Sequence, residues 1–338
     1  MNCPICNSVM SEPVGKLFAL PSVTSDCRPW GAGRSVQICS GCGVMRRVTK
    51  DGALFERVYD DYKSYPEPYG RTTKILEFVK DKMPEPKKIL DVGCGEGHGM
   101  KVMAEFFADS EVYGYEPYRD KLRPQRRHDL VTLFHVLEHV EDINEMLDYV
   151  KSVLSDDGHA LIQVPYTMMW PFDLILADHW WHFNTVSLSK LLEDSGFSVE
   201  YIGNDCIKKE ITCLARFTNK SKDLYGKSES VKFAEELLKE KNLNAINWLL
   251  NYKKFLDTID EPVAVFGTGP AAVWAGSILG DRVDCYLEDD NSRDRLFNGK
   301  IVMNPSVYIE YDKHCVVAPF PDWQLRSIKA KHPELRFL

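Results

Sequence analysis

Residues 89–97 read Ile-Leu-Asp-Val-Gly-Cys-Gly-Glu-Gly, a short apolar run that leads directly into alternating glycines. The run predicts a buried strand, and the glycines predict a tight turn into a helix expected from Gly99 to Phe107. Because glycine has no Cβ, the backbone can pass close to a ligand there, and the next helix offers free N–H groups at its N-terminus. The stretch therefore predicts the strand, ligand loop and helix that begin a doubly wound α/β fold.

Similar strand and helix patterns alternate through the rest of the segment from 87 to 218. We expect strands at 88–92, 111–115, 129–134, 159–164 and 196–202, and helices at 144–154 and 187–195. Short apolar runs separated by helices indicate a largely parallel sheet covered by helices.

Acidic residues follow or end the first two predicted strands. The charge of Asp91 beside the loop would repel a pyrophosphate and suits a sulfonium and an amino group; the Gly-x-Gly-x-Gly spacing also differs from that of dinucleotide sites. Glu116, about 20 residues after the loop, is placed to accept hydrogen bonds from ribose hydroxyls. A tight turn without a ligand and a solvated strand end are the alternatives.

Together with residues 129–140 and 156–165, these features resemble the class I S-adenosylmethionine-dependent methyltransferases over about residues 87 to 218. The resemblance implies a Rossmann-like methyltransferase core. It also implies a set of cofactor-binding residues: Asp91, Gly93, Gly95, Gly97, Glu116, Pro117, Phe134, His135 and Glu138.

One other motif competes for part of this segment. His135, Glu138 and His139 match the inverzincin zinc-protease pattern, which needs both histidines on one helical face. The preceding residues 130–134 have β character, so the pair is expected at a strand end and a turn. The protease alternative predicts a second metal ion in each chain.

Two Cys-x-x-Cys pairs lie near the N-terminus, formed by Cys3 with Cys6 and by Cys39 with Cys42. Thiolates two residues apart in a turn can both reach a tetrahedral Zn²⁺ at ~2.3 Å, and a second pair completes its shell. The 32 residues between the pairs exceed the usual loop of a zinc ribbon. We expect a structural zinc with no open position for chemistry; a redox pair or unbound thiols are the alternatives.

The net charge and the apolar content of the sequence limit the kinds of molecule that the protein is expected to bind. The net charge of −8 and the lack of a Lys/Arg block argue against nucleic acid. No stretch approaches 18 uninterrupted apolar residues and the N-terminus lacks a signal-like apolar region, so we expect a cytoplasmic protein that does not enter a membrane.

The 338 residues suffice for two or three domains. The expected parts are a four-cysteine zinc-binding module at 1–55, a Tyr-rich linker and helix at 56–86, a cofactor-binding methyltransferase domain at 87–218, a helical connection at 219–260 and a smaller C-terminal α/β domain at 261–338. In the last part, residues 267–269 read Gly-Thr-Gly and follow a predicted strand. This pattern fits either a second ligand loop or a plain turn.

This order of parts resembles the sugar C-methyltransferases, which act on nucleotide-activated deoxysugars. The resemblance implies a Tyr-rich segment before the cofactor domain, where Tyr62 and Tyr65 fall, and a histidine base beside a carboxylate, where His179 and Asp178 fall. Carbon methylation needs a base to form an enolate, whereas oxygen methylation needs only hydroxyl deprotonation. The expected acceptor is a small molecule, a nucleotide sugar; a packing role for the His-Trp-Trp-His run 179–182 is the alternative.

The sequence departs from these families in three places. The cofactor loop is generic rather than Asn-Asp-Gly, and the Tyr segment lacks the Tyr-x-Tyr-x-Ser spacing of the sugar enzymes. Residues 117–128 are too few for the helix and third strand that class I domains place there. Either the domain lacks this element, leaving adenine to Tyr118 or Leu122, or the chain is internally shortened. A catalytically inactive protein that binds a sugar nucleotide or a partner is the alternative function.

Overall fold

The structure is a computed structural model that describes residues 1–32, 34–48, 70–218, 229–289, 296–310 and 315–338. Tyr62 and Tyr65 lie outside these ranges. Contacts divide the chain into two units. The first contains 1–14, 36–169 and 179–242, and the second contains 15–35, 170–178 and 243–338.

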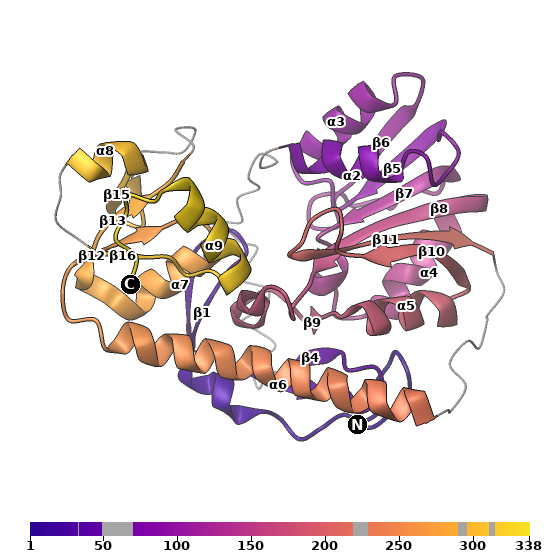
Figure 1. Cartoon of the computed structure of the whole chain (residues 1–338). Helices are drawn as coiled ribbons and strands as arrows, with labels where there is room; N and C mark the ends of the chain where they lie inside the picture. The colour runs from indigo at the N-terminus through magenta and orange to yellow at the C-terminus, as the bar shows by residue number, and fades with distance from the viewer. Residues whose placement is uncertain (33, 49–69, 219–228, 290–295, 311–314) are drawn as a thin grey trace. The chain divides into compact units, whose positions relative to one another are not determined.

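A six-stranded sheet organises the first unit (Figure 1). In spatial order its strands are β10 (Phe197–Gly203), β11 (Glu210–Phe217), β8 (Leu154–Pro165), β7 (His128–Phe134), β5 (Lys88–Val92) and β6 (Glu111–Tyr115). The strands from β8 to β6 pair in parallel, and β11 runs antiparallel between β8 and β10. The predicted strands of this segment are confirmed, and the sheet is mixed because β11 reverses direction.

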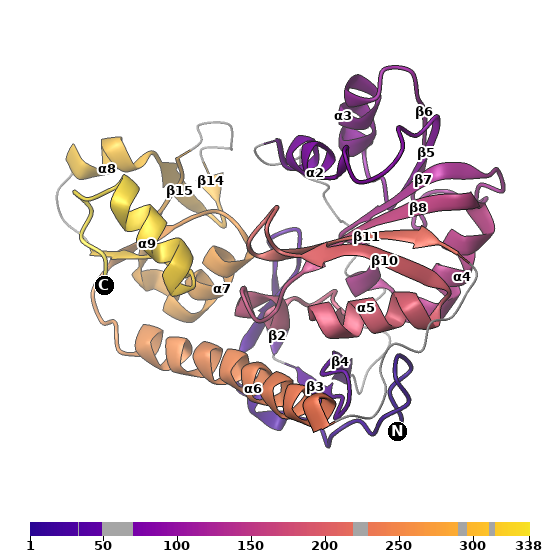
Figure 2. The ribbon, with the colours of Figure 1, turned by 45° about the vertical axis from the view of Figure 1, so that its right-hand side comes forward.

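Helices cover both faces of this sheet, as Figure 2 shows. On one face, α2 (Arg71–Val79) and α3 (His98–Phe106) pack on Ile89, Leu130 and Leu161. On the other, α4 (Ile143–Val153) and α5 (Thr185–Asp194) pack on Leu90 and Val131. Adjacent residues of each strand thus face opposite layers, as the pleat of a strand requires. Being buried on both faces explains why these strands read as continuous apolar runs.

Polar side chains cap the N-termini of α4 and α5. Asp142 accepts hydrogen bonds from the backbone N–H groups of Asn144 and Glu145, which begins α4. Asn184 and Ser187 form a reciprocal capping box at α5. Each cap satisfies N–H groups that have no partner within the helix.

The segment between β6 and β7 contains no regular element. Residues 117–127 form turns and bends, with neither helix nor strand. Within the described residues, β6 is therefore an edge strand of the sheet. Turns and bends stand where class I domains have a helix and a third strand, as the shortness of this segment implied.

The N-terminal cysteine module joins this unit through a small sheet. Strands β3 (Ser35–Ile38), β4 (Met45–Val48) and β9 (Trp181–His182) lie side by side, with β4 and β9 antiparallel. The cysteines Cys3, Cys39 and Cys42 belong to the same buried core as the sheet residues and α5. The cysteine module and the methyltransferase-like sheet consequently share one hydrophobic core.

The second unit is a smaller α/β layer around a five-stranded sheet. Its strands in spatial order are β14 (Leu296–Phe297), β15 (Lys300–Met303), β13 (Val283–Leu287), β12 (Val263–Phe266) and β16 (Cys315–Val317). Only β14 pairs antiparallel among these described strands. Its helices include α7 (Pro270–Leu279), α8 (Pro305–Glu310) and α9 (Asp322–Lys331).

Residues 15–35 contribute to this second unit rather than to the cysteine module. They form a 3-10 turn, η1 (Gly15–Ala19), and the hairpin β1 (Pro21–Val23) with β2 (Pro29–Ala32), which contacts α7. A further 3-10 turn, η5 (Pro171–Ile175), also belongs here. The long interval between the two Cys pairs is thus an excursion of the chain into the other unit.

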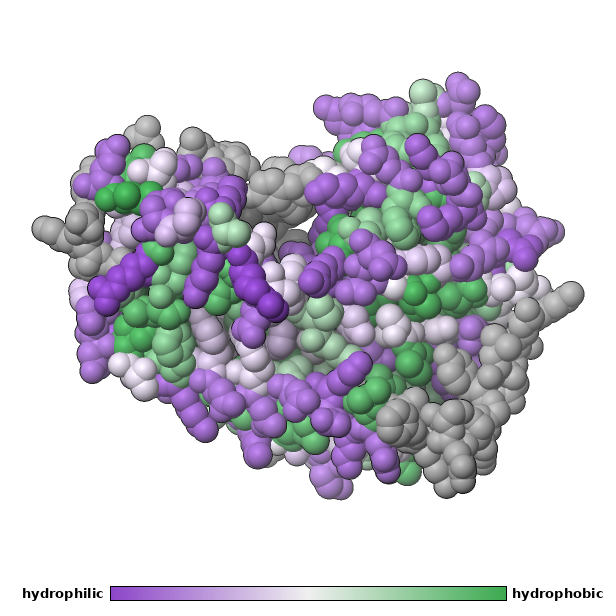
Figure 3. Space-filling model, viewed as in Figure 1, coloured by the Kyte–Doolittle hydropathy of each residue, from purple (hydrophilic) through white to green (hydrophobic). Residues whose placement is uncertain are grey.

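The long helix α6 (Glu229–Asp257) contributes its first part to one unit and its last part to the other. On the face shown in Figure 3, hydrophilic side chains are widespread and hydrophobic ones form scattered patches. Among the described residues, no helix combines the length and the apolar character that crossing a membrane requires.

Replacement of Gly43 by alanine tests how closely α6 packs on the cysteine module. A Cβ at Gly43 (φ 68°) would lie 2.9 Å from the Cβ of Leu238, whereas one at Gly70 (φ 62°) would meet no atom of the described residues within 4 Å. Both variants carry left-handed strain of roughly 1–2 kcal/mol, and only Gly43→Ala adds overpacking of about 1–3 kcal/mol. We expect urea unfolding to show the larger loss of stability for Gly43→Ala, and equal losses would contradict the close approach.

Candidate active site

The glycine loop joins β5 to α3 with a left-handed backbone at each of its glycines. Gly93, Gly95 and Gly97 have φ values of 75°, 49° and 83°. A Cβ at Gly93 would lie 2.5 Å from Cγ2 of Val136, which follows β7. Glycine is required at this position by both conformation and space.

Asp91 lies beneath this loop and is 5% exposed. The hydroxyl of Thr132 on β7 donates to Oδ1 of Asp91 at 2.6 Å. Burial raises the pKa of Asp91 to about 7, the Thr132 hydrogen bond lowers it, and the nearby Glu116 charge raises it further. A carboxylate in this setting gains from a cationic ligand group, which would favour its charged form.

Glu116 directly follows β6, and its side chain contacts the glycine loop. Its Oε2 accepts a hydrogen bond from the backbone N–H of Gly95 at 2.9 Å. Arg119 donates to the carbonyl of the same glycine at 2.8 Å. The predicted Asp91, glycine loop and Glu116 therefore meet at the carboxyl ends of β5 and β6, where open α/β sheets bind ligands.

His135 begins the segment after β7 and has a positive φ of 57°. Its Nδ1 lies 3.0 Å from Oε1 of Glu138, and its Nε2 lies 3.0 Å from Nη1 of Arg71 and 3.5 Å from a carboxylate oxygen of Glu210. Although burial raises the pKa of Glu210, the charges of His135 and Arg71 outweigh it and hold the value at about 2. Arg71 and Glu210 had no signal in the sequence, because α2 and β11 bring them to His135 only in the fold.

A second cluster lies on the other side of Glu138. Ligand atoms of Glu138, His139 and His179 all lie within 4.8 Å of one another. The rings of His139 and His179 meet edge to face with centroids 4.6 Å apart. The backbone N–H of Trp180 donates to the carbonyl of Glu138 at 2.7 Å, which ties the segment of His179 to the end of β7.

The remaining predicted residues lie close to these groups in the chain. Phe134 is the last residue of β7, and Pro117 follows Glu116 in the turn after β6. Asp178 belongs to the second unit, where its carboxylate accepts hydrogen bonds from the backbone N–H of Ser25 at 3.0 Å and from the Ser25 hydroxyl. No sequence pattern indicated the Ser25 contact, which depends on residues 15–35 folding with 170–178.

The inverzincin alternative requires His135 and His139 to converge. Within the described residues, the metal-compatible cluster that contains His139 includes His179 and not His135. His135 faces Arg71 and Glu210 instead. The two histidines of the motif therefore belong to different networks.

The four N-terminal cysteines converge as the spacing predicted. The sulfurs of Cys3, Cys6, Cys39 and Cys42 all lie within 4.8 Å of one another, with 3.8 Å between Cys3 and Cys42 and 3.3 Å between Cys6 and Cys39. Four thiol groups around one point match the donor set of a structural Zn²⁺ site. The described residues that would hold the ion are these four.

Two buried amides connect this cluster to helices of the same unit. Asn184 at the start of α5 donates to the carbonyl of Cys42 at 3.0 Å, and Asn242 of α6 donates to the carbonyl of Gly43 at 2.8 Å. Neither asparagine was singled out by sequence, because an isolated Asn carries no chemical signature.

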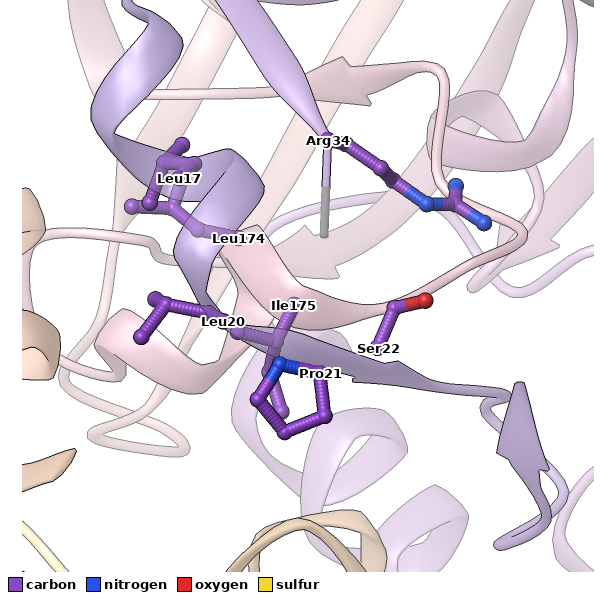
Figure 4. A pocket seen from close by; sticks show the side chains of 7 residues that line it. All are labelled: Leu17, Leu20, Pro21, Ser22, Arg34, Leu174 and Ile175. Atoms are coloured by element: carbon purple, nitrogen blue, oxygen red, sulfur yellow. The ribbon is translucent and has the colours of Figure 1, made fainter. Parts of the chain in front are cut away.

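A small recess in the second unit, shown in Figure 4, offers no comparable chemistry. It is lined by Leu17, Leu20, Pro21, Ser22, Arg34, Leu174 and Ile175. The guanidinium of Arg34 donates to the carbonyl of Ala177. The mainly apolar lining of this recess indicates that η1, the β1–β2 hairpin and η5 pack together there.

Residues 67–202 match a family model described as a methyltransferase domain. This match covers the glycine loop, Glu116 and both histidine networks except Glu210. The chain contains a class I methyltransferase domain. No curated protein matches the sequence.

Solved structures similar to this chain share little sequence with it. A methyltransferase from Aquifex aeolicus is 14% identical with a TM-score of 0.37, covering 50% of this chain and 100% of its own. One from Mesorhizobium loti is 17% identical with a TM-score of 0.34, covering 42% and 97%. Human N-acetylserotonin methyltransferase with bound S-adenosylmethionine is 14% identical with a TM-score of 0.37; the coverage is 44% of this chain and 52% of the human one. The chain thus spans about half the length of the human enzyme.

Removal of one cysteine of the four-cysteine cluster should destabilise the methyltransferase domain, because the cysteine module shares its core. We expect Cys39→Ser to lose bound zinc and to lower the Tm of the domain, since metal binding energy is folding energy in such sites. Cys206→Ser is the matched control, because Cys206 is half-buried outside the cluster. Metal content and thermal unfolding measure the effect; a Cys39→Ser protein with a full zinc equivalent and an unchanged Tm would contradict it.

Cofactor affinity should fall as the pH is lowered through about 7. Below its raised pKa of about 7, Asp91 is mostly protonated, and the proton must leave before the carboxylate can pair with a cationic ligand group. The affinity for S-adenosylhomocysteine is therefore expected to drop by up to about tenfold per pH unit on the acid side and to level off above it. Calorimetry across this range, with Asp91→Asn as the pH-insensitive control, makes the measurement.

Proposed function

We propose that the chain transfers a methyl group from S-adenosylmethionine to a small acceptor. The observation that carries the proposal is the joint position of Asp91, the glycine loop and Glu116 at the carboxyl ends of β5 and β6. The methyltransferase family match over 67–202 supports it independently. When bound, the cofactor supplies an electrophilic methyl group on a sulfonium.

Different residues of the site would hold different parts of the cofactor. The loop from Gly93 to Gly97 presents backbone with few side chains, Asp91 provides negative charge beneath it, and Glu116 offers acceptor oxygens for ribose hydroxyls. When a ligand enters, the backbone N–H of Gly95, which donates to Glu116 in this structure, can donate its hydrogen bond to the ligand instead. Holding the methyl donor and the nucleophile in line supplies much of the acceleration of a transfer reaction.

The acceptor must also lose a proton, and we assign this step to the neighbourhood of His179. The side chain is 2% exposed and packs edge to face with His139, beside the end of β7. Its sequence neighbour Asp178 and the residues Tyr62 and Tyr65 stay proposed contributors, as the sugar-enzyme resemblance implies. Deprotonation at a positioned imidazole typically contributes a factor of about 10²–10⁴ in rate.

A nucleotide-activated sugar is the acceptor class we propose, with carbon or oxygen as the methylated atom. Support comes from the order of a four-cysteine module, a methyltransferase domain and a second α/β unit, which resembles the sugar C-methyltransferases. A structural Zn²⁺ in the four-cysteine cluster belongs to the same proposal. A cytoplasmic location is part of the same proposal.

Calorimetry with zinc-loaded protein tests the cofactor assignment. We expect S-adenosylmethionine and S-adenosylhomocysteine to bind, and Gly93→Ala to abolish binding because its Cβ would displace Val136. Gly31→Ala is the control, since Gly31 has a φ of 101° and a Cβ there would have no atom of the described part of the chain within 4 Å. The proposal would be falsified by a folded, zinc-loaded protein that binds neither compound.

A measurement of turnover distinguishes the proposed enzyme from the alternative, an inactive protein that binds a ligand. Nucleotide sugars incubated with labelled cofactor should gain a methyl group detectable by mass spectrometry, and His179→Ala should slow this gain by about 10²-fold or more while cofactor binding persists. Cofactor binding without transfer to any nucleotide sugar, and without an effect of His179→Ala, would favour the alternative.

A further inference from the structure

We propose that Glu138, His139 and His179 form a second metal site, which binds a divalent transition-metal ion with an open coordination position. The site lies in the first unit, where the end of β7 meets the segment before β9. It is separate from the four-cysteine cluster in both residues and ligand chemistry.

Geometry is the first support. One ligand atom from each of the three residues lies within 4.8 Å of the others, and Glu138 and His179 are buried to 0% and 2% exposure. Glu138 and His139 are adjacent in the short turn η4 (Leu137–His139), so both are placed by the same local structure. His179 reaches them because Trp180 is hydrogen-bonded to the Glu138 carbonyl.

The second support is an unsatisfied oxygen. Oε1 of Glu138 is engaged by His135, but Oε2 has no hydrogen-bond partner among the described residues although it is fully enclosed. Burying a carboxylate oxygen without a partner is costly, and buried charges in native proteins are paired or coordinate metals. A cation between Glu138 and the two imidazoles would satisfy this oxygen.

The donor set defines the class of ion. Two imidazole nitrogens and one carboxylate oxygen suit Zn²⁺, Mn²⁺, Fe²⁺ or Co²⁺, and three protein ligands leave at least one position for water or substrate. The contact between His135 and Glu138 supplies the outer hydrogen bond that commonly orients a metal-bound carboxylate. The four-cysteine cluster, in contrast, offers a closed shell.

The role of the ion rests on the proposed function. An acceptor oxygen bound at the open position would lose its proton at lower pH, because a divalent cation stabilises the oxyanion. With the ion bound, His179 would act as a metal ligand rather than as the base itself, and the proton of the acceptor would pass to water. Metal binding itself needs no assumption about the reaction.

Cobalt titration tests the site directly. Protein whose four-cysteine cluster is filled with Zn²⁺ is freed of loosely held metal and titrated with Co²⁺, followed by visible absorption and calorimetry. We expect one equivalent to bind with d–d bands and without the charge-transfer bands of thiolate ligands. No binding, or thiolate bands alone, would overturn the proposal.

Variants assign the ligands. Glu138→Gln keeps the shape of the side chain and removes its charge; His179→Ala removes an imidazole. Both should weaken Co²⁺ binding by more than the roughly 10–100-fold typical of losing an outer-shell partner. His159→Asn is the matched control, because His159 is a buried histidine of the same sheet that pairs with Glu200. If His179→Ala does not fold, Glu138→Gln decides, and binding that survives in folded Glu138→Gln counts against the site.

S-adenosylhomocysteine binding is measured on the same samples. Cobalt binding without it would leave the metal site standing and count against the methyl transfer. Binding of S-adenosylhomocysteine without binding of Co²⁺ would count against the metal site and leave the methyl transfer standing.

Discussion

The joining of the cysteine module to the rest of the first unit depends on the pairing of β4 with β9. It joins two segments more than a hundred residues apart, Met45 with His182 and Arg46 with Trp181. Along the chain, β4 closely follows Cys42, and β9 closely follows His179. Hydrogen bonds from Asn184 and Asn242 to Cys42 and Gly43 reinforce the same contact. The cysteine cluster is thereby connected to the segment that contains His179.

This arrangement couples the four-cysteine cluster to the packing of the methyltransferase domain. The cysteines share a buried core with Val131, Leu133 and Trp181, so the order of one depends on the order of the other. In the segment from 179 to 184, Trp180 donates to the carbonyl of Glu138 and Asn184 donates to the carbonyl of Cys42. Positioning of reactive groups through packed neighbours is a general requirement of enzyme sites.

Sequence predicted the features whose cause is local. The glycine loop, its strand and its helix follow from adjacent residues, and the Cys pairs are recognisable by their spacing. Arg71 and Glu210 were missed because their meeting with His135 depends on α2 and β11 packing in the fold. The excursion of 15–35 was missed for the same reason, since nothing in a Gly- and Pro-rich stretch states which unit it joins. Residues whose role depends on a distant partner carry no local pattern.

The shortened segment after β6 has a consequence for how the molecule meets other chains. Without a third strand, the backbone of Glu111–Tyr115 ends the sheet within the described part of the chain, and free edges invite strands from neighbouring molecules. The turn that follows carries five basic side chains: Arg119, Lys121, Arg123, Arg126 and Arg127. Arg119 and Arg127 are fixed to backbone carbonyls of Gly95 and Leu154, so part of this charge is held close to the sheet. Basic side chains beside an exposed strand disfavour its pairing with the same edge of another molecule, because like charges repel.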